Sequence, residues 1–437
     1  MEWWVALAFL LGGLCVFFIL GMPVAFCFLI INLAAALVFW GGEAGIRQLM
    51  LSLYGSIASF ALLPLMLFIL MGEILFETGM ALETINTLDK WVGRLPGRLG
   101  LLAVGAGTLL ATLTGASMAS VAILGSALTP EMEKRGYKKS MSLGPIMGSG
   151  ALAPMIPPSS LSVLMAVLAG ASVAGVLIGA IIPGLIMAGL YVTYIIIRCW
   201  LQPDLAPPYN VPPAPLSEKL KLTAKYVLPL GAVIFMVTGI IILGVATPSE
   251  AAATGALGSF ILAGFYRKLN WRVIKKTFQQ TLIISGMIFI IISASIAFGY
   301  VLGFSGASQG LTNFITSLPL PPIVVIILLQ ILLIIIGGPI NPLTVLMALV
   351  PLFVPVLEAY GMDPVWFCVT LMLNVELSNI TPPYGSTIFV MQGVAPPDTT
   401  LGDIFNATWP WVWMDMFVLA LLIAFPQLTL WLPGLIR

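Results

Sequence analysis

Long apolar runs separated by short polar stretches dominate the sequence. The runs at 3–20, 23–40, 56–76 and 176–197 all have lengths within the range of about 17–25 residues that a membrane-spanning helix requires. The whole chain has room for roughly a dozen such helices. We therefore predict an all-α polytopic membrane protein. Its first apolar run should be retained as a span, because no Lys or Arg precedes it as in a cleaved signal peptide.

Composition agrees with the membrane assignment and excludes several classes of function. Of the 437 residues, 60% are hydrophobic and 8% are charged, against roughly 25% charged residues in a soluble domain. A net charge of +1 gives no field for binding nucleic acid. The sequence has no His, no nucleotide-binding Gly-x-x-x-x-Gly-Lys-Ser/Thr loop, and four cysteines without metal-ligand spacing. We therefore expect that the protein is not an enzyme. Any transport against a concentration gradient must be driven by an ion gradient or by another subunit.

The two halves of the sequence share Pro, Gly and Glu positions at a constant offset of 225 residues (248 − 23 = 225). The pairs are Pro23 with Pro248, Pro96 with Pro321, Pro130 with Pro355, Glu133 with Glu358, Gly136 with Gly361, and Pro157-Pro158 with Pro382-Pro383. This coincidence in one ungapped register indicates an ancient duplication. We predict two repeats, at 1–197 and 226–437, joined by a Pro-rich polar linker at 198–225.

Basic residues mark the cytoplasmic ends of membrane spans and set the expected topology. Basic clusters flank the segment at about 99–130, which is too long for one crossing and too short for two, so it should enter and return as a re-entrant hairpin. The equivalent hairpin at about 322–357 has no basic flanks and should open outward. Five crossings and one hairpin per repeat make the repeats inverted, with a cytoplasmic linker and a periplasmic N-terminus.

Each expected hairpin is followed by a span that must break. The spans at 141–168 and 365–394 contain the paired prolines, which remove backbone donors and clash with the preceding helical turn. Unwound backbone deep in a membrane is tolerated only where it is buried in protein or lines a cavity. Helix ends there offer carbonyls to cations and amides to anions. Two hairpin tips and two discontinuous helices therefore predict a site for an anion and coupling cations.

No Lys or Arg lies within these four elements, so we expect an anionic substrate to be held by dipoles, hydroxyls, amides and co-bound sodium ions. The candidate sodium ligands are Thr114, Gly115 and Ser117 with Pro154, Met155 and Ser159, and, in the second half, Gly337, Gly338 and Asn341 with Ser378, Asn379 and Thr381. The candidate substrate ligands are Ser117, Ser159, Ser160, Asn341, Asn379, Thr381 and Pro382. No other metal and no organic cofactor is expected. The alternative is that these residues only serve helix packing, as small residues do in many membrane bundles.

Three carboxylates lie inside apolar spans, where an unpaired charge costs several kcal/mol. Glu73, Glu376 and Asp415 are therefore functional candidates, and Glu376 lies beside the second break. The alternative for Glu376 is a protonated side chain, or one hydrogen-bonded to freed backbone. Glu250, which follows a Thr-Pro-Ser sequence, is expected to cap a helix.

Three further features are interpreted from their position. The tryptophans near the chain ends, which are Trp3, Trp4, Trp409, Trp411, Trp413 and Trp431, are interpreted as interface anchors. The basic run 267–276 is interpreted as a solvated cytoplasmic loop, with contact to a partner or lipid headgroups as the alternative. The loop 395–403 is placed inside by symmetry alone, because it has Asp398 and Asp403 and no basic residue.

Four sequence blocks resemble the large membrane subunit, of the DctM type, in tripartite ATP-independent periplasmic (TRAP) transporters. The blocks are Leu113-Thr-Gly-Ala-Ser-Met-Ala-Ser-Val-Ala, 130–136, Met147-Gly-Ser-Gly-Ala-Leu-Ala-Pro-Met-Ile-Pro-Pro-Ser and 376–385. The resemblance extends over nearly the whole chain. It implies a bacterial inner-membrane importer of organic acid anions, driven by a sodium gradient and supplied by a periplasmic substrate-binding protein.

The same resemblance implies a second membrane partner and a mechanism. The partner is a small subunit of about four spans, of the Q type, expected as a separate polypeptide because the chain starts directly at its first large-subunit span. The mechanism is elevator-type alternating access, in which hairpins and broken spans move as a block against a scaffold. By analogy, the scaffold is expected at 3–40 and 227–265, with arms along the membrane near 42–53 and 271–280.

Two other transport functions stay open at this point. A self-sufficient sodium–anion symporter of the same inverted-repeat architecture would need no binding protein. A passive anion channel would conduct without stoichiometric sodium coupling. Dicarboxylates, sugar acids, keto acids and sulfonates all fit a site that lacks a fixed cation.

Overall fold

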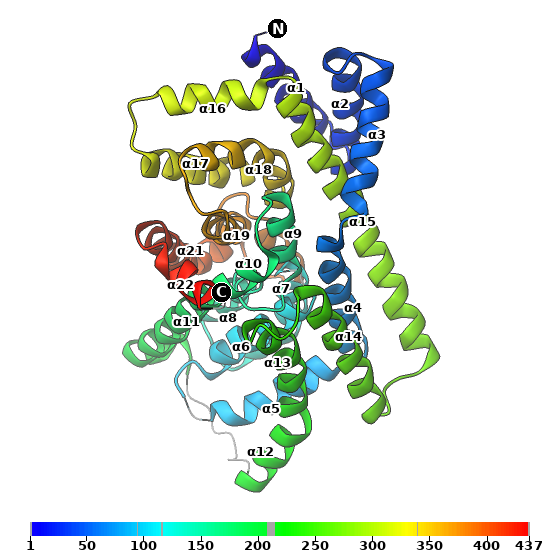
Figure 1. Ribbon diagram of the computed structural model, residues 1–437. Helices are drawn as coiled ribbons and strands as arrows, with labels where there is room; N and C mark the ends of the chain where they lie inside the picture. Colours follow the sequence, from blue (N-terminus) through cyan, green and yellow to red (C-terminus); the bar gives the residue numbers. More distant parts are fainter. Residues whose placement is uncertain (1, 94, 115–116, 208–214, 339, 436–437) are drawn as a thin grey trace.

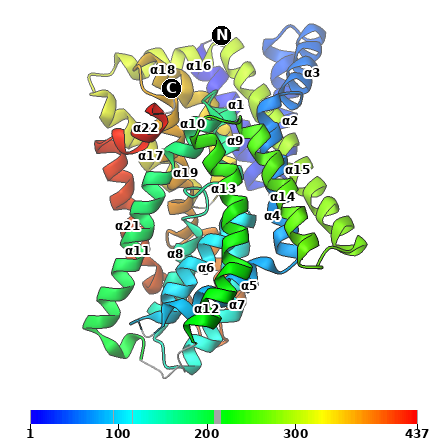
Figure 2. The ribbon, with the colours of Figure 1, turned by 60° about the horizontal axis from the view of Figure 1, so that its bottom comes forward.

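The computed structural model describes residues 2–93, 95–114, 117–207, 215–338 and 340–435, without the side chains of residues 81–82 and 111–114. Helices make up 82% of the structure and the described residues form no β-strand, so the predicted all-α fold is confirmed. Figures 1 and 2 show the helices in two orientations.

The first half of the chain contains a helical hairpin and a broken helix after a set of N-terminal helices. The N-terminal helices are α1 (Trp3–Ile19), α2 (Val24–Phe39), α3 (Glu43–Ile57), η1 (Phe60–Leu62), α4 (Leu63–Glu77) and α5 (Met80–Val92). The hairpin is α6 (Arg98–Thr114) with α7 (Ser117–Lys134), and the broken helix is α8 (Lys139–Gly150) with α9 (Ser160–Leu168). The helices α10 (Val173–Gly179) and α11 (Ile181–Leu201) complete this half.

The second half also contains a helical hairpin and a broken helix after a set of other helices. Its first helices are η2 (Pro203–Leu205), α12 (Leu216–Leu222), η3 (Thr223–Val227), α13 (Leu228–Ile242), α14 (Pro248–Phe265), α15 (Trp271–Phe304) and α16 (Ala307–Ser317). The hairpin α17 (Pro322–Gly337) with α18 (Pro342–Ala359), the broken helix α19 (Pro364–Ile380) with α20 (Ser386–Val394), and the helices α21 (Leu401–Ala424) and α22 (Gln427–Gly434) follow.

Many of these helices are apolar enough to lie in a membrane. In the described part of the chain, six helical stretches have the length and hydropathy of a membrane span. They are Phe60–Glu77, Val173–Leu201, Leu216–Ile242, Trp271–Phe304, Pro342–Ala359 and Leu401–Ala424. Shorter apolar helices are Trp3–Ile19, Val24–Phe39, Arg98–Leu110, Pro322–Gly337 and Pro364–Ile380. The protein is therefore a multi-pass membrane protein.

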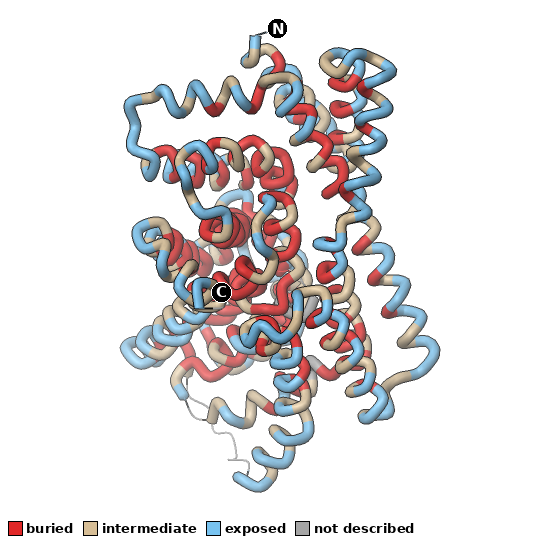
Figure 3. The backbone as a smooth tube through the Cα atoms, viewed as in Figure 1, coloured by how far each residue is buried: buried red, intermediate tan, exposed pale blue. Residues whose placement is uncertain are grey.

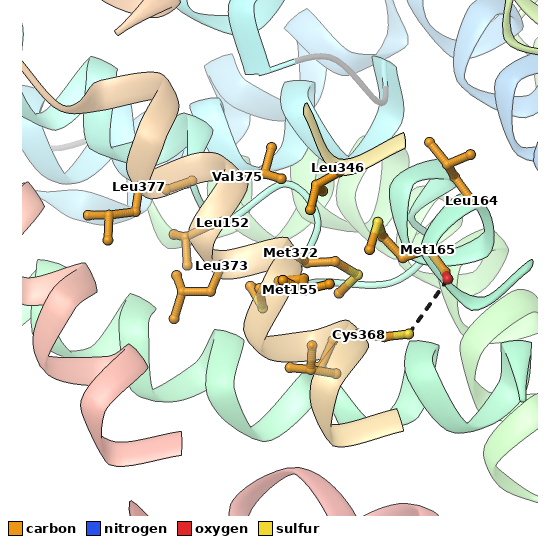
Figure 4. Close-up of a cluster of buried hydrophobic side chains, with 14 of the residues drawn as sticks. Leu152, Met155, Leu164, Met165, Leu346, Cys368, Met372, Leu373, Val375 and Leu377 are labelled. Carbon is orange, nitrogen blue, oxygen red and sulfur yellow. Dashed lines mark hydrogen bonds between the residues drawn. The ribbon is translucent and has the colours of Figure 1, made fainter. Parts of the chain in front are cut away.

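The first segments of the two broken helices, α8 and α19, form the most buried part of the molecule. In α8, all residues from Met141 to Gly150 are buried, and in α19 the same holds from Trp366 to Ile380. Figure 3 shows this burial at the centre, whereas α3 and α12 are largely exposed. Figure 4 shows Leu152 and Met155 from the first break packed with Met372 and Leu373 of α19. The first break is thus enclosed by protein, as unwound backbone in a membrane can be, whereas Pro383 and Tyr384 of the second break are exposed.

A second group of helices lies along one side of the molecule (Figures 1 and 2). In this group α14 packs against α4 and α13, and α15 packs against α2, α3 and α4. The segment expected as an arm near 271–280 is the start of the 34-residue helix α15, and not an element of its own. The physical reason is that residues 271–285 contain no Gly or Pro to interrupt the helix.

One interpretation from the sequence is confirmed and another is wrong. Thr247 and Glu250 form a capping box at the start of α14, so the expected cap is confirmed. Trp411 is not an interface anchor, because its ring is fully buried. Gly148 of α8 leaves room for that ring, and Tyr191 of α11 contacts it edge-on with centroids 4.7 Å apart.

The acidic loop before α21 lies beside the basic cluster before α8. Lys139 Nζ is 2.9 Å from Asp398 Oδ2 and 2.9 Å from Glu133 Oε1, and it donates to Thr399 Oγ1 at 2.7 Å. The hydrogen bond from Lys139 holds the pKa of Asp398 below its ordinary value. These contacts put the loop on the same face as Lys139 and join the base of the first hairpin to the second half of the chain.

Candidate functional site

The tip of the first hairpin lies against the first broken helix. A Cβ placed on Gly107 of α6 would collide with the Ser149 side chain of α8, and one on Gly150 would stand 3.3 Å from Ser117 Cβ. Ser120 Oγ of α7 donates to the Gly107 carbonyl at 3.0 Å, which closes the two arms of the hairpin on each other. Small residues therefore let α6, α7 and α8 approach closely, as is usual in membrane bundles.

Ser117 also connects this tip to the second half of the chain. Its hydroxyl donates to Glu376 Oε1 at 2.7 Å, and Asn379 Nδ2 donates to the other carboxylate oxygen at 3.4 Å. Both Ser117 and Glu376 are buried, at 8% and 3% exposure. Within the described residues, the recorded partners of the Glu376 carboxylate are side chains, and not the backbone freed at the break that was considered as the alternative. The functional candidate Glu376 thus joins the sequence-predicted residues Ser117 and Asn379 in one cluster.

The tip of the second hairpin lies against the second broken helix. A Cβ on Gly337 would stand 3.2 Å from Ser378 Oγ, and one on Gly338 would stand 3.5 Å from Tyr384 Cβ. Asn341 is exposed, and its side-chain oxygen accepts from the Leu343 amide at 3.0 Å to cap α18. The structure therefore brings Gly337 and Ser378 together as expected neighbours, while Asn341 has a capping contact of its own.

A buried amide network that was not among the sequence candidates fixes α17 to α19. Asn374 Nδ2 donates to the side-chain and backbone oxygens of Gln330, at 2.6 and 2.9 Å. Gln330 Nε2 donates to Thr370 Oγ1 at 3.1 Å, and Ser378 Oγ donates to the Asn374 carbonyl at 2.9 Å. The available signals were a lone Gln in the apolar run 322–337 and Asn374 at the start of the polar positions before the second break.

The second break is held by side chains on both sides of it. Asn379 Oδ1 accepts from Ser386 Oγ, and the Asn379 carbonyl accepts from Thr387 Oγ1, each at 2.7 Å. Thr381 Oγ1 donates to the Leu377 carbonyl at 2.5 Å. Pro382 follows directly and is half-buried. The end of α19 and the start of α20 are thus tied together across only five residues, 381–385.

The first break is longer and is held mainly by packing. Ser159 caps α9 by accepting from the Ser162 amide at 3.2 Å, and Ser162 Oγ donates to the Pro154 carbonyl at 3.1 Å. The Met155 carbonyl faces Gly184 of α11, where an added Cβ would lie 2.7 Å from it. Ser160 begins α9 and is half-buried.

Two of the sequence candidates lie outside what the structure describes. Gly115 is outside the described residues, and the same holds for the side chain of Thr114, whose backbone ends α6. Of the three candidate sodium ligands at this tip, Ser117 is therefore the one whose side chain the structure describes. The other first-half candidates, Pro154, Met155 and Ser159, occupy the facing break.

The remaining carboxylate candidates are Glu73 and Asp415. Tyr191 Oη donates to Asp415 Oδ1, and neither residue is exposed to solvent. This pair joins α11 to α21 next to the buried Trp411. Glu73 is half-buried in α4, one helical turn from Glu77, which pairs with Lys276 at 2.8 Å. Asp415 thus has a direct partner for one oxygen.

A large open cavity lies between parts of the hairpin region and the peripheral helices, although α15 also packs against α18. Its volume is about 1040 Å³, and α3 and α15 line one side while the ends of α9 and α18 line the other. Lining residues include Ser52, Ser56, Tyr300, Val167, Pro355 and Glu358. Because the two walls belong to different helix groups, a relative shift of the groups would change the size of this cavity.

Comparison with known protein families identifies the family to which the chain belongs. Residues 11–428 match the family described as "Tripartite ATP-independent periplasmic transporter, DctM component". The chain belongs to this family. It is therefore a large permease component of the TRAP type, as the resemblance of its sequence blocks predicted, and its relatives are transporter permeases and not enzymes.

Relatives of this TRAP permease are named after several different substrates. The C4-dicarboxylate TRAP transporter large permease DctM of Rhodobacter capsulatus is 29% identical, over 97% of this chain and 98% of its own length. The ectoine/5-hydroxyectoine large permease UehC of Ruegeria pomeroyi is 28% identical, over 96% and 97%. The isethionate permease DctMQ of Oleidesulfovibrio alaskensis is 27% identical over 97% of this chain, which spans 66% of that longer protein.

Solved structures show that the fold is shared with other transporters. The YdaH transporter of Alcanivorax borkumensis aligns with a TM-score of 0.62 and 17% identity, over 91% of this chain and 96% of its own. MtrF of Neisseria gonorrhoeae, described in connection with antimetabolite efflux pumps, aligns with a TM-score of 0.62 and 13% identity, over 92% and 95%. At these identities the likeness concerns the fold alone.

Proposed function

We propose that this TRAP permease imports a small organic acid anion by coupling its uptake to sodium. The observation that carries the proposal is the meeting of both halves at one buried cluster, where Ser117 of the first hairpin donates to Glu376 beside the second break. No Lys or Arg lies within 99–133, 140–168, 322–357 or 364–394 to neutralise an anion. A mobile cation that enters with the substrate supplies that missing charge.

The oxygen atoms available at this cluster are suitable ligands for sodium. Ser117, Ser378 and Thr381 each donate their hydroxyl proton to another oxygen, so each hydroxyl oxygen keeps lone pairs for a cation. The unwound segments 151–159 and 381–385 add backbone carbonyls. These groups are neutral oxygen ligands, and sodium binding to them requires no proton release.

The proposed duplication is supported by the helix bounds. Shifting α7 by the sequence offset gives 342–359 (117 + 225 and 134 + 225), which are the bounds of α18. The same shift takes α8, which begins at 139, to 364, where α19 begins. We propose the repeats at 1–197 and 226–437 as inverted units, with the N-terminus in the periplasm.

Alternating access is proposed to follow an elevator motion. The hairpins and broken helices would move as one block, and α1, α2, α13 and α14 would act as scaffold. The cavity of about 1040 Å³ supports this division when α3 and α15, which line its outer wall, are assigned to the scaffold group. In the described part of the chain, a polar contact joins α15 to α18, from Ser295 Oγ to the Met347 carbonyl, and the motion would break it.

Substrate delivery is proposed to depend on two partners. The family is described as tripartite, which implies a small membrane subunit and a periplasmic binding protein. The relatives are named for C4-dicarboxylates, ectoines and isethionate, so permeases of this family serve chemically different solutes. We propose that the binding protein selects the organic acid and passes it to the buried cluster.

Reconstitution tests this proposal. The chain and its small subunit are placed in liposomes, and uptake of radiolabelled succinate, ectoine and isethionate is measured under an inward sodium gradient or an equal potassium gradient. Uptake should need sodium and the cognate binding protein. Equal uptake without the binding protein would favour a self-sufficient symporter. Substrate flux that is not accompanied by a fixed number of sodium ions per substrate would favour a channel.

A further inference from the structure

The corner between α14 and α15 has an exposed, basic and aromatic surface. α14 ends at Phe265 and α15 begins at Trp271, and these side chains are 81% and 77% exposed. The corner lies at the periphery of the molecule in both ribbon views, and the tube in Figure 3 is largely exposed there. Exposed aromatic rings at the end of a membrane helix are typical of the headgroup region of a bilayer.

The cations at this corner differ in whether they have acidic partners. Lys276 lies 2.8 Å from Glu77, and Lys268 lies 4.0 Å from Glu83. By contrast, Arg267, Arg272 and Lys275 are exposed and have no ion pair or hydrogen bond from their side chains within the described residues. Arg272 and Lys275 are three positions apart on one helix, so their side chains are neighbours. Three uncompensated positive charges therefore gather at one turn.

Arg267 occupies a backbone position that favours glycine. Its φ is 54°, and it is the one non-glycine residue with positive φ in the described part of the chain. It caps α14 in a Schellman arrangement, with the Arg267 amide bonded to the Gly264 carbonyl and the Lys268 amide to the Ala263 carbonyl. The equivalent residue in the first half is Gly42 (267 − 225 = 42), with φ 68°. An Arg in this strained position points to a role for its side chain.

We propose that Arg267, Arg272 and Lys275 bind the phosphate headgroup of an anionic phospholipid in the cytoplasmic leaflet. Arginine and lysine donors match phosphate oxygens, and such a leaflet attracts clustered cations beside membrane helices. The exposed face of α15 continues from Trp271 and Lys275 through Phe278 to Leu282 at helical spacing. A face that changes from basic to aliphatic along one helix suits a lipid, which presents a headgroup and then its acyl chains. This inference does not depend on the proposed substrate or on sodium.

Lipid binding to the purified full-length protein, with any small subunit that accompanies it, tests the inference. The probes are phosphatidylglycerol and phosphatidylcholine, added in detergent and followed by native mass spectrometry, with inorganic phosphate as a separate arm. We expect retention of phosphatidylglycerol over phosphatidylcholine, and no effect of millimolar phosphate. The triple variant R267Q/R272Q/K275Q should bind phosphatidylglycerol about a hundredfold more weakly, at about fivefold per cation.

Two variants separate this role from simpler explanations. R267G relieves the backbone strain, so it should raise the melting temperature in lipid-free detergent while weakening phosphatidylglycerol binding about fivefold. The control K134Q/K138Q/K221Q removes three other exposed cations and should leave the affinity within about twofold of wild type. Equal losses in the two triple variants, or unchanged binding in R267Q/R272Q/K275Q, would overturn the proposal. Loss of the small subunit from R267Q/R272Q/K275Q with lipid binding intact would assign the surface to that subunit instead.

Discussion

The two broken helices have similar positions in the chain but are held by different chemistry. The first break spans nine residues, 151–159, and is held by packing and by hydroxyl contacts close in the sequence. The second spans five residues, 381–385, and is surrounded by Glu376, Asn379 and a buried amide network. The equivalents of Glu376 and Asn374 in the first half are Ala151 and Ser149 (376 − 225 and 374 − 225). The order of helices is therefore similar in both halves, whereas the charged and amide groups of the site belong to the second.

The largest effect is expected from removing the carboxylate that this comparison singles out. Glu376→Ala leaves the buried donors of Ser117 and Asn379 without their acceptor, at a cost of about 3 kcal/mol or about a hundredfold in uptake rate. Glu376→Gln keeps an oxygen for Ser117 and should lose less. Sodium-driven uptake in proteoliposomes measures both variants. Wild-type uptake by Glu376→Ala, at equal amounts of folded protein, would show that the asymmetry between the breaks has no role in transport.

The amide network should matter more for stability than its first-half counterpart. Asn374→Leu removes two hydrogen bonds to Gln330 and leaves that amide buried without them, which we expect to cost about 2 kcal/mol of unfolding free energy. Ser149→Ala removes only a bond to the Ile146 carbonyl of the same helix and should cost less than about 0.5 kcal/mol. Thermal unfolding in detergent compares the two variants. Equal destabilisation would mean that both broken helices rely on their polar contacts to the same degree.

Sodium affinity should respond to hydroxyls from both halves. Ser117→Ala and Thr381→Ala each remove one candidate oxygen, and we expect each to raise the sodium concentration for half-maximal uptake about fivefold. Ser126→Ala on the exposed face of α7 and Thr78→Ala, which loses a similar bond to a carbonyl four residues earlier, are the matched controls. An unchanged sodium response in both single variants would contradict the ligand assignment.

Local features of the sequence are informative about where helices begin and break. Apolar runs fix the spans, and paired prolines stop α8 and α19 from continuing, because both effects act within a few residues. The bond between Ser117 and Glu376 joins residues 259 positions apart, so it depends on how the two halves pack. No local pattern contains that information. Gln330 and Asn374 were visible as amides in the sequence, but their pairing also depends on packing.

Trp411 shows why position along the chain is a poor guide to burial. Several tryptophans cluster near the C-terminus, and Trp409 and Trp413 are exposed as an interface would require. Trp411 instead points to the opposite side of the helix, where Gly144 and Gly148 of α8 leave a groove for its ring. Those glycines are more than 260 positions away in the sequence. Only the packing of α21 on α8 distinguishes this tryptophan from its neighbours.

The smallest effect is expected where the second half of the chain contacts the base of the first hairpin. Lys139 binds Glu133 within the first half and Asp398 in the loop before α21. Because the Lys139 hydrogen bond lowers the pKa of Asp398, the contact stabilises the fold above the ordinary pKa of a free aspartate and is lost as the pH falls through the lowered value. Asp398→Asn should therefore make the melting temperature slightly less sensitive to acid between pH 7 and pH 3.

Asp204→Asn, at an acidic position outside this cluster, is the control. An unaltered acid sensitivity in Asp398→Asn would mean that the exposed Asp398 contributes nothing measurable, as is common for surface ion pairs. The contact between the hairpin base and this loop would then rest on the hydrogen bond from Lys139 to Thr399.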